Sequence, residues 1–185
     1  MEFSYFEPDK ALRDYVSSYY FVSFPFAISD IMRAEIANAR FVLKGAVMSD
    51  LSGEQVRFDA PSAPLCGPTY RWSRIEFAPD TTIFGAAITP LGWCRLFGYS
   101  AEEAADNHTP LQDVIPADKH PLIDAVFDAP DKEAIINAAD NLFTALVSDK
   151  WKIREDFIEL ATNWIVDPEP NEIEHLLEAC DLSHR

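Results

Sequence analysis

Histidine and cysteine are the residues of this 185-residue chain most suited to chemistry, and they are widely spaced. The four histidines, His108, His120, His175 and His184, include no i, i+4 pair and no His-X-His. Metal sites draw clustered ligands at short spacing from at least one element. Residues 15–88, which are predicted to form strands, contain no histidine. The sequence therefore predicts neither a metal site nor a cofactor.

Cys94 is the candidate nucleophile, because the charge of the neighbouring Arg95 would lower the pKa of its thiol. A cysteine nucleophile also needs a base within hydrogen-bond reach, and nothing in the sequence places one there. We interpret Cys94 as a small apolar side chain of a helix. No glycine-rich phosphate loop and no GxSxG motif occurs in the sequence. No catalytic residue is predicted, and the chain is not expected to be an enzyme.

The segment 70–74, Tyr-Arg-Trp-Ser-Arg, is the most suggestive candidate for ligand binding. A strand that carries aromatic rings and arginines can line a pocket for an anionic or aromatic small molecule. The predicted ligand-binding residues are Tyr70, Arg71, Trp72 and Arg74. In the alternative interpretation Trp72 belongs to the core and both arginines balance an acidic surface.

Composition limits the classes of protein to which the chain can belong. Its net charge of -16 and pI of about 4.4 argue that this chain does not bind nucleic acid by itself. Three widely spaced cysteines, Cys66, Cys94 and Cys180, indicate a reducing compartment. The first ten residues do not resemble a signal peptide, and no apolar stretch of about 20 residues occurs. We therefore expect a cytoplasmic protein without a membrane span.

Residues 15–88 contain the elements that would position a pocket. Segments rich in β-branched and aromatic residues predict strands, with one or two in the second segment, at 15–24, 32–48, 55–58, 71–77 and 81–88. Residues 59–70 hold three prolines and a glycine, which predict a loop with an extended piece at its centre. Short strands separated by turns are typical of an antiparallel sheet or barrel.

From residue 90 to residue 147 the pattern is mostly helical. Helices are predicted at 91–97, 120–127 and 131–147. Ser100 followed by Glu103 forms a capping box that predicts the start of another helix. Strands followed by helices indicate the α+β class, with residues 1–150 as one domain.

Residues 151–185 predict two amphipathic helices. The apolar face of the first comprises Ile153, Phe157, Leu160, Ala161 and Trp164, and that of the second Ile173, Leu176, Leu177 and Cys180. The prolines of residues 167–170 end the first helix, and Asn171 is the predicted N-cap of the second. Asp181 ends the second helix, and Ser183 is a candidate cap for a third. This arrangement is half of a helix-turn-helix; the alternative is a hairpin that only packs on its own domain.

The segment EIEHLLEACDLSHR resembles the first helix-turn-helix of the AraC-type transcription regulators. Leu176 stands at the helix-core position of the family, and Leu182-Ser183 match the pair that opens its recognition helix. Leu177 stands where the family usually has alanine, and Asp181 where it usually has glycine. Glycine suits a left-handed turn residue best, and aspartate tolerates that conformation at some cost.

The N-terminal half is similar to the sensor half of one branch of the same family. The matching motifs, in order, are Leu12-Arg13, Tyr15-Val16, Tyr19-Tyr20, Gly67-Pro68-Thr69-Tyr70 and Ile88-Thr89-Pro90. The resemblance implies a β-rich, barrel-like (cupin-like) sensor domain, a helical connector and a DNA-binding domain with two helix-turn-helix units. Residues 151–185 would be an incomplete first unit, because the groove-reading helix lies beyond them.

Partners are also implied by the resemblance: a small-molecule effector, a second copy of the chain in a homodimer, and DNA. Ser183, His184 and Arg185 would begin the DNA-contacting part. Residues 151–185 carry three basic and nine acidic residues, so the positive charge that DNA requires is expected beyond Arg185. Two other classes stay open. One is a small-molecule enzyme with a β-rich active site, and the other is a stand-alone acidic interaction protein.

Overall fold

The computed structural model describes residues 1–51, 53–149, 154–170 and 172–181. The chain divides into an N-terminal unit, Met1–Ser148, and a C-terminal unit, Asp149–Arg185. Each unit is described by itself. None of the helices in the described ranges has the length and apolar character that a membrane crossing requires.

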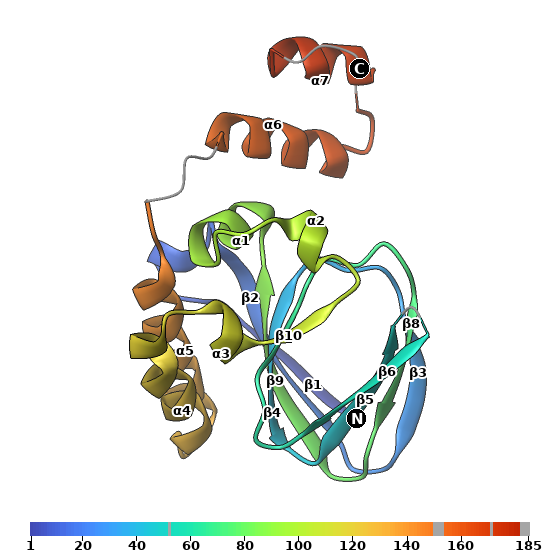
Figure 1. Ribbon diagram of the computed structural model, residues 1–185, viewed down its shortest axis with the longest axis vertical. Helices are drawn as coiled ribbons and strands as arrows, with labels where there is room; N and C mark the ends of the chain where they lie inside the picture. Colours follow the sequence, from blue (N-terminus) through green and yellow to red (C-terminus); the bar gives the residue numbers. More distant parts are fainter. Residues whose placement is uncertain (52, 150–153, 171, 182–185) are drawn as a thin grey trace. The chain divides into compact units, whose positions relative to one another are not determined.

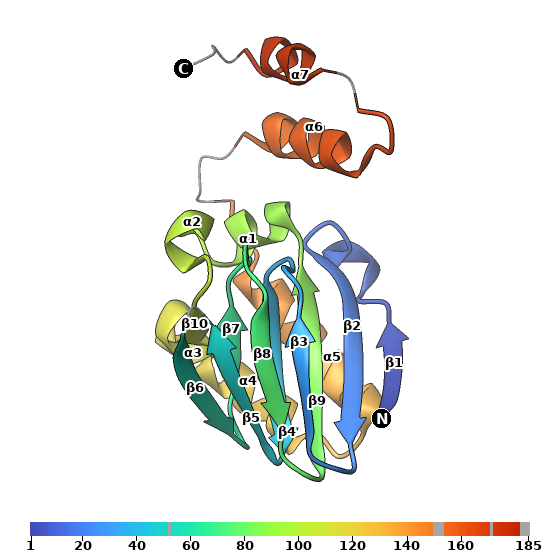
Figure 2. The same cartoon turned by 90° about the vertical axis from the view of Figure 1, so that its right-hand side faces the viewer.

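Two antiparallel sheets form the β part of the N-terminal unit (Figures 1 and 2). The six-stranded sheet has the order β1 (Glu2–Phe6), β2 (Val16–Phe24), β9 (Thr81–Ile88), β4 (Asn38–Lys44), β7 (Pro64–Cys66) and β10 (His108–Pro110). The four-stranded sheet has the order β3 (Ile28–Met32), β8 (Ser73–Phe77), β5 (Ala46–Leu51) and β6 (Glu54–Asp59). The two sheets face each other, so residues on their inner faces surround a common interior.

Some helices of the N-terminal unit cover the outer face of the six-stranded sheet, and others lie at one end of the sheets (Figure 1). They are η1 (Lys10–Leu12), α1 (Pro90–Leu96), α2 (Ala101–Ala104), α3 (Leu111–Val114), η2 (Ala117–Lys119), α4 (His120–Asp128) and α5 (Lys132–Leu146). The longest, α5, begins where the Asp131 side chain accepts a hydrogen bond from the Ala134 amide. Leu142 and Phe143 of α5 are fully buried against the sheet.

Side chains alternate along each strand between the core beneath the helices and the interior between the two sheets. On β2, Tyr19 and Phe21 belong to the core beneath the helices, whereas Tyr20, Val22 and Phe24 lie between the sheets. On β9, Phe84 packs toward the helices and Ile83 toward the interior between the sheets. One strand therefore contributes to both cores.

The C-terminal unit contains α6 (Glu155–Val166) and α7 (Ile173–Ala179). Helix α6 ends before Asp167 and Pro168, as the prolines predict. Arg154 donates from Nη1 to the carbonyl oxygen of Cys180 at 2.9 Å, which connects the start of α6 to the end of α7. Asp181, which follows the C-cap residue Cys180 of α7, has a φ of 53° and is left-handed. The predicted contributions of Ile153, Asn171 and residues 182–185 lie outside the described residues.

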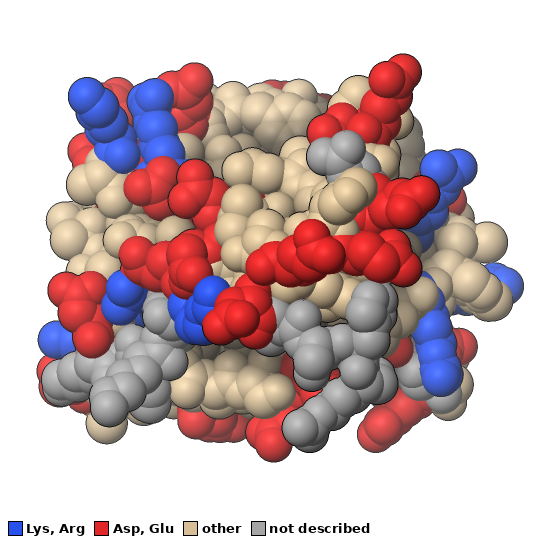
Figure 3. All heavy atoms as spheres, turned by 90° about the horizontal axis from the view of Figure 1, so that it is seen from above, with Lys and Arg blue, Asp and Glu red and all other residues tan. Residues whose placement is uncertain are grey.

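Acidic surface predominates in this protein, as its net charge requires. Asp and Glu side chains are more widespread than Lys and Arg on the face shown in Figure 3. Glu155 and Asp156 begin α6, where carboxylates interact favourably with the helix dipole.

The predicted α+β class, with an antiparallel β part followed by helices, is confirmed. The segments 15–24 and 81–88 form β2 and β9, and Ser100 caps α2 by accepting a hydrogen bond from Glu103. The prediction missed β1, β3 and β10. The first two are five-residue edge strands without a fully buried residue, and β10 has three residues. Their short patterns depend on pairing partners far away in the sequence.

Candidate ligand-binding cavity

A cavity of about 530 Å³ lies between the two sheets. Its volume is in the range of small-molecule binding sites. Most of its wall is apolar, and the side chains that line it from both sheets include Val22, Phe24, Val42, Val47, Phe58, Ile75, Phe77 and Ile83. An apolar wall of this kind favours binding of a molecule with a substantial apolar body.

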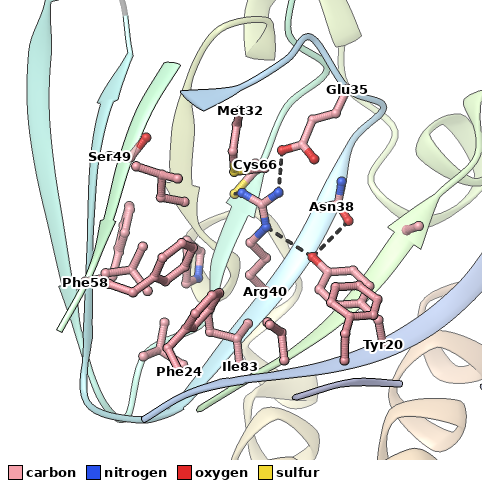
Figure 4. A pocket seen from close by; sticks show the side chains of 18 of the residues that line it. Tyr20, Phe24, Met32, Glu35, Asn38, Arg40, Ser49, Phe58, Cys66 and Ile83 are labelled. Atoms are coloured by element: carbon pink, nitrogen blue, oxygen red, sulfur yellow. Dashed lines mark hydrogen bonds and ion pairs between the residues drawn. The ribbon is translucent and has the colours of Figure 1, made fainter. Parts of the chain in front are cut away.

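Arg40, on β4, forms the polar end of the cavity (Figure 4). Its Nε donates a hydrogen bond to the Tyr20 hydroxyl at 3.1 Å, and its Nη2 forms an ion pair with Glu35. Its Nη1 lies 3.6 Å from the Cys66 sulfur. The Arg40 side chain is only 13% exposed, so its charge is neutralised mainly by these neighbours rather than by water.

The surroundings of Arg40 keep its guanidinium group protonated. Burial opposes the charge of Arg40, but Tyr20, Cys66 and Glu35 outweigh it and raise the pKa of Arg40 well above its usual value. Burial raises the pKa of Tyr20 and that of Cys66, although Arg40 lowers both. The charged arginine therefore faces a neutral phenol, a neutral thiol and one carboxylate.

Four further hydrogen bonds hold Tyr20 and Glu35 in place. The Tyr20 hydroxyl donates to Asn38 Oδ1 at 3.2 Å, and Asn38 Nδ2 donates to the Ile36 carbonyl at 2.8 Å. The Glu35 amide donates to Thr69 Oγ1 at 2.8 Å, and the Thr69 amide donates to the Glu35 carbonyl at 3.0 Å. The side chains around Arg40 thus belong to one hydrogen-bonded network.

Gly85 makes the position of Tyr20 possible. It pairs with Tyr20 between β9 and β2, and the tyrosine ring lies directly over it. A Cβ at residue 85 would stand 2.0 Å from Tyr20 Cζ. Only glycine allows the ring to lie across β9 and reach Asn38 and Arg40.

His108 contributes a second polar position from β10. One ring nitrogen, Nε2, lies 3.0 Å from Ser49 Oγ, and the ring packs edge-on against Phe58. The other, Nδ1, is buried and has no hydrogen-bond partner among the described residues. Burial, with a smaller contribution from Arg40, lowers the pKa of His108 to about 4, so the ring is neutral near pH 7.

Strand pairing aligns three polar residues across the wall. Cys66 on β7 is opposite Asn38 on β4 and also opposite His108 on β10. A thiol beside an imidazole is the pair that a cysteine nucleophile needs. Here burial raises the pKa of the thiol and lowers the pKa of the imidazole, so both rest neutral and the thiol is not activated.

Aromatic side chains of β1 form part of the cavity rim. Phe3 stacks on Tyr20 with ring centroids 5.8 Å apart, and Tyr5 is 4.7 Å from Phe3. Phe3 is 45% exposed and Tyr5 69% exposed, although both line the cavity. This rim offers an apolar approach to the interior.

The four residues predicted to bind a ligand lie on the surface, and none of them lines the cavity. Tyr70, Arg71 and Trp72 precede β8, and Arg74 is on its exposed face. The Tyr70 amide donates a hydrogen bond to Asp106 Oδ1 at 2.9 Å. A role for these residues in ligand binding stays a prediction.

Cys94, interpreted from the sequence as an apolar helix residue, is half-buried in α1, and burial raises the pKa of its thiol although Arg95 lowers it. The predicted DNA-contacting residues Ser183, His184 and Arg185 lie outside the described residues. Groups of three or more potential metal ligands are absent from the described part of the chain.

Sequence reasoning missed Arg40, Glu35 and His108. Arg40 carried a usable signal, because it interrupts the apolar pattern of a strand on the same face as Val42. Glu35 and His108 carried none, because neither belongs to a long periodic element. Their proximity to the cavity depends on the pairing of β4, β7 and β10.

Fold and cavity together define an α+β protein whose antiparallel sheets enclose a space of ligand size. No protein-family model matches the chain, and no curated protein matches it in sequence. Among solved structures, ToxT of Vibrio cholerae, an AraC-family regulator, is similar over 89% of this chain and 69% of its own, with 8% identity and a TM-score of 0.49.

Cupin structures are similar to about half of the chain. A cupin superfamily protein from Desulfitobacterium hafniense has 10% identity and a TM-score of 0.37, covering 47% of this chain and 77% of its own. A predicted oxalate decarboxylase from Thermotoga maritima has 14% identity and a TM-score of 0.38, covering 47% and 78%. At these values the likenesses carry no argument about ligand, reaction or partner.

Proposed function

We propose that this chain is the effector-sensing and dimerisation part of an AraC-type transcription regulator. In this proposal residues 1–150 bind a small-molecule effector in the cavity between the sheets, and residues 151–185 begin a DNA-binding domain. The DNA itself is contacted by sequence beyond Arg185, and two copies of the chain act as a homodimer. The proposal is carried by the conformation of Asp181.

Asp181 adopts the left-handed conformation at the position where the resemblance implies a glycine. Asp181 follows Cys180, the C-cap of α7, and has a φ of 53°; its amide donates to the Glu178 carbonyl at 3.1 Å. A left-handed residue at this point ends the helix and turns the chain. Aspartate is among the few residues other than glycine that adopt this conformation as single residues. A turn at this position is what the proposed helix-turn-helix requires, and it supports the proposal.

The cavity supports binding more than catalysis. Arg40, Tyr20 and Glu35 are hydrogen-bonded to one another, and Cys66 and His108 are both neutral at rest. Enzymes generally hold an acid, base or nucleophile with a pKa suited to its task. The described groups of this cavity are instead arranged to recognise a polar atom on an otherwise apolar molecule.

Helix α5 is the element that would carry the effector signal out of the sheet. Tyr20 faces the cavity, while its neighbour Tyr19 faces α5 and donates from its hydroxyl to Asp140 at 2.9 Å. An effector that moves Tyr20 would therefore displace β2 and change how Tyr19 contacts α5. In the proposed regulator, this change alters the spacing of two DNA-binding domains.

The gene sequence beyond the codon for Arg185 gives the first test. We expect a basic, leucine-rich recognition helix, followed by a second helix-turn-helix about 50 residues further on. A stop codon directly after Arg185 would contradict the proposal and favour the stand-alone acidic interaction protein.

Effector dependence gives the second test, made with the full-length gene product in its native host. Val47→Phe places a larger side chain in the cavity, and Met48→Phe makes the same kind of change on a residue that does not line it. We expect Val47→Phe to abolish effector-dependent transcription of the target genes and Met48→Phe to retain it. A normal effector response in Val47→Phe, equal to that of Met48→Phe, would show that the cavity is not the effector site.

A further inference from the structure

We infer that the cavity binds an uncharged, largely apolar molecule that presents one hydrogen-bond acceptor, such as a ketone or ester carbonyl oxygen, to Arg40. This inference rests on the proposed function only in taking the cavity as the effector site. It specifies the chemical class of the effector.

The charge of the cavity argues for an uncharged ligand. Arg40 and Glu35 both line the cavity and form an ion pair, and burial keeps His108 neutral near pH 7. The polar end of the cavity therefore has no net charge. A carboxylate that entered would leave an unbalanced negative charge in a poorly solvated site, which is costly.

Glu35 occupies the position that a ligand carboxylate would otherwise take on Arg40. Its backbone is fixed by two hydrogen bonds to Thr69, one through each of its main-chain polar groups. The Glu35 side chain is 28% exposed, so it approaches Arg40 from the more open side of the site. Replacing this internal carboxylate by an external one would give up a pair that is already held in place.

The remaining donors of Arg40 argue for an acceptor on the ligand. A guanidinium group carries five N–H bonds. Within the described residues, acceptors are found for Nε, for one N–H of Nη2 at Glu35 and, more weakly, for one N–H of Nη1 at Cys66. The two remaining N–H groups of Arg40 have no acceptor in the described part of the chain. A carbonyl oxygen would accept a charge-assisted hydrogen bond without altering the net charge.

The apolar wall and the aromatic rim account for the rest of the ligand. Phe24, Phe77 and Ile83 extend the apolar surface beyond Arg40, and Phe3 adds an exposed ring at the rim. Burial of an apolar body supplies the binding free energy, and the Arg40 contact fixes its orientation.

Methyl octanoate and octanoate are suitable probes, because they share one apolar chain and differ in charge. The purified 185-residue chain is first loaded with the neutral dye Nile red, and displacement of the dye is followed by fluorescence at pH 7.5. We expect methyl octanoate to bind about tenfold more tightly than octanoate, or better. Octanoate binding as tightly as the ester, or failure of both probes to displace the dye, would overturn the inference.

Glu35→Gln provides the matching variant, since it removes the internal carboxylate and leaves Arg40 with an uncompensated charge. We expect this variant to gain affinity for octanoate and to narrow or reverse the preference for the ester. Glu54→Gln, at an exposed position on β6 outside the cavity lining, should behave as the unmodified chain. An unchanged preference in Glu35→Gln would contradict the assigned role of the ion pair.

The probe experiment and the transcription experiment fail independently. A cavity that prefers octanoate overturns the inference about ligand class and leaves the proposed sensor function intact. A Val47→Phe regulator with a normal effector response overturns the sensor function, whichever probe binds to the purified chain.

Discussion

Tyr19 and Tyr20 are consecutive on β2 and donate their hydroxyl hydrogens on opposite faces of the same sheet. Tyr19 donates to Asp140 of α5 at 2.9 Å, and Tyr20 donates to Asn38 beside the cavity at 3.2 Å. Both rings are held in aromatic contacts, Tyr19 with Phe143 and Tyr20 with Phe3. The pair therefore joins the ligand cavity to the longest helix of the N-terminal unit through one short piece of backbone.

Tyr19→Phe should weaken this connection without changing the cavity. It removes the hydrogen bond to Asp140, which keeps the hydrogen bond from the Asp9 amide at 3.0 Å. Loss of a hydrogen bond to a carboxylate lowers the free energy of unfolding by about 1–3 kcal/mol. We expect that loss in urea unfolding, faster hydrogen exchange in α5, and ligand affinity within about twofold of the unmodified chain.

Tyr15→Phe is the matched control for this substitution. The Tyr15 hydroxyl makes no hydrogen bond within the described ranges, so its removal should leave the free energy of unfolding nearly unchanged. Equal effects of the two substitutions would mean that the Tyr19–Asp140 bond contributes nothing specific.

Gly85→Ala should displace Tyr20 from the cavity wall. The new Cβ would lie 2.0 Å from Tyr20 Cζ, and the ring would have to move away from Asn38 and Arg40. Overpacking of this kind lowers the free energy of unfolding by about 1–3 kcal/mol. We also expect weaker binding of methyl octanoate in the dye-displacement assay.

A double-mutant cycle identifies the cause. In a Tyr20→Ala background the ring is absent, so adding Gly85→Ala should cost little further stability. If Gly85→Ala is as destabilising in that background as in the unmodified chain, the close approach of the ring is not the reason for the glycine.

The sequence allowed prediction of those elements whose signals are local. The β-branched and aromatic residues of β2, the helical periodicity of α5 and the prolines after α6 each act within a few residues. The left-handed residue expected after the second C-terminal helix is Asp181, which has a φ of 53°.

The cavity is different, because long-range pairing assembles it. Arg40 on β4 lies beside Cys66 on β7. Ser49, on the four-stranded sheet, lies beside His108, on the six-stranded sheet, although these two residues are 59 positions apart in the chain. No local pattern encodes such neighbours. The sequence predicts that residues 70–72 follow the alternation of a strand. They lie before the start of β8, so that alternation does not apply to them.

His108 should make the stability of the protein depend on pH. Its pKa is lowered from 6.5 to about 4 in the folded chain, so between these values the unfolded chain binds a proton that the folded chain does not. Stability from neutral His108 is complete above pH 6.5 and is lost as the pH falls toward 4. The loss amounts to at most about 3.5 kcal/mol, because one pKa unit corresponds to about 1.4 kcal/mol.

His108→Gln tests this dependence, because glutamine does not titrate. In urea unfolding at several pH values, the free energy of unfolding should fall less between pH 6.5 and pH 4 in this variant than in the unmodified chain. His175→Gln, at an exposed position on α7, should retain the full dependence. Identical pH profiles for His108→Gln and the unmodified chain would exclude His108 as the cause.

Thiol reactivity distinguishes the sensor proposal from the enzyme alternative. Burial raises the pKa of Cys66, and the neutral His108 opposite it does not act as a resting ion-pair partner. We expect alkylation of Cys66 by iodoacetamide to be slow near pH 7 and to accelerate only above the usual thiol pKa of about 8.5. Mass spectrometry of the chain follows each cysteine separately, and half-buried Cys94 provides the internal comparison. Rapid alkylation of Cys66 at pH 7, lost in His108→Gln, would instead indicate an activated thiol and favour an enzyme, because only a thiolate reacts quickly at that pH.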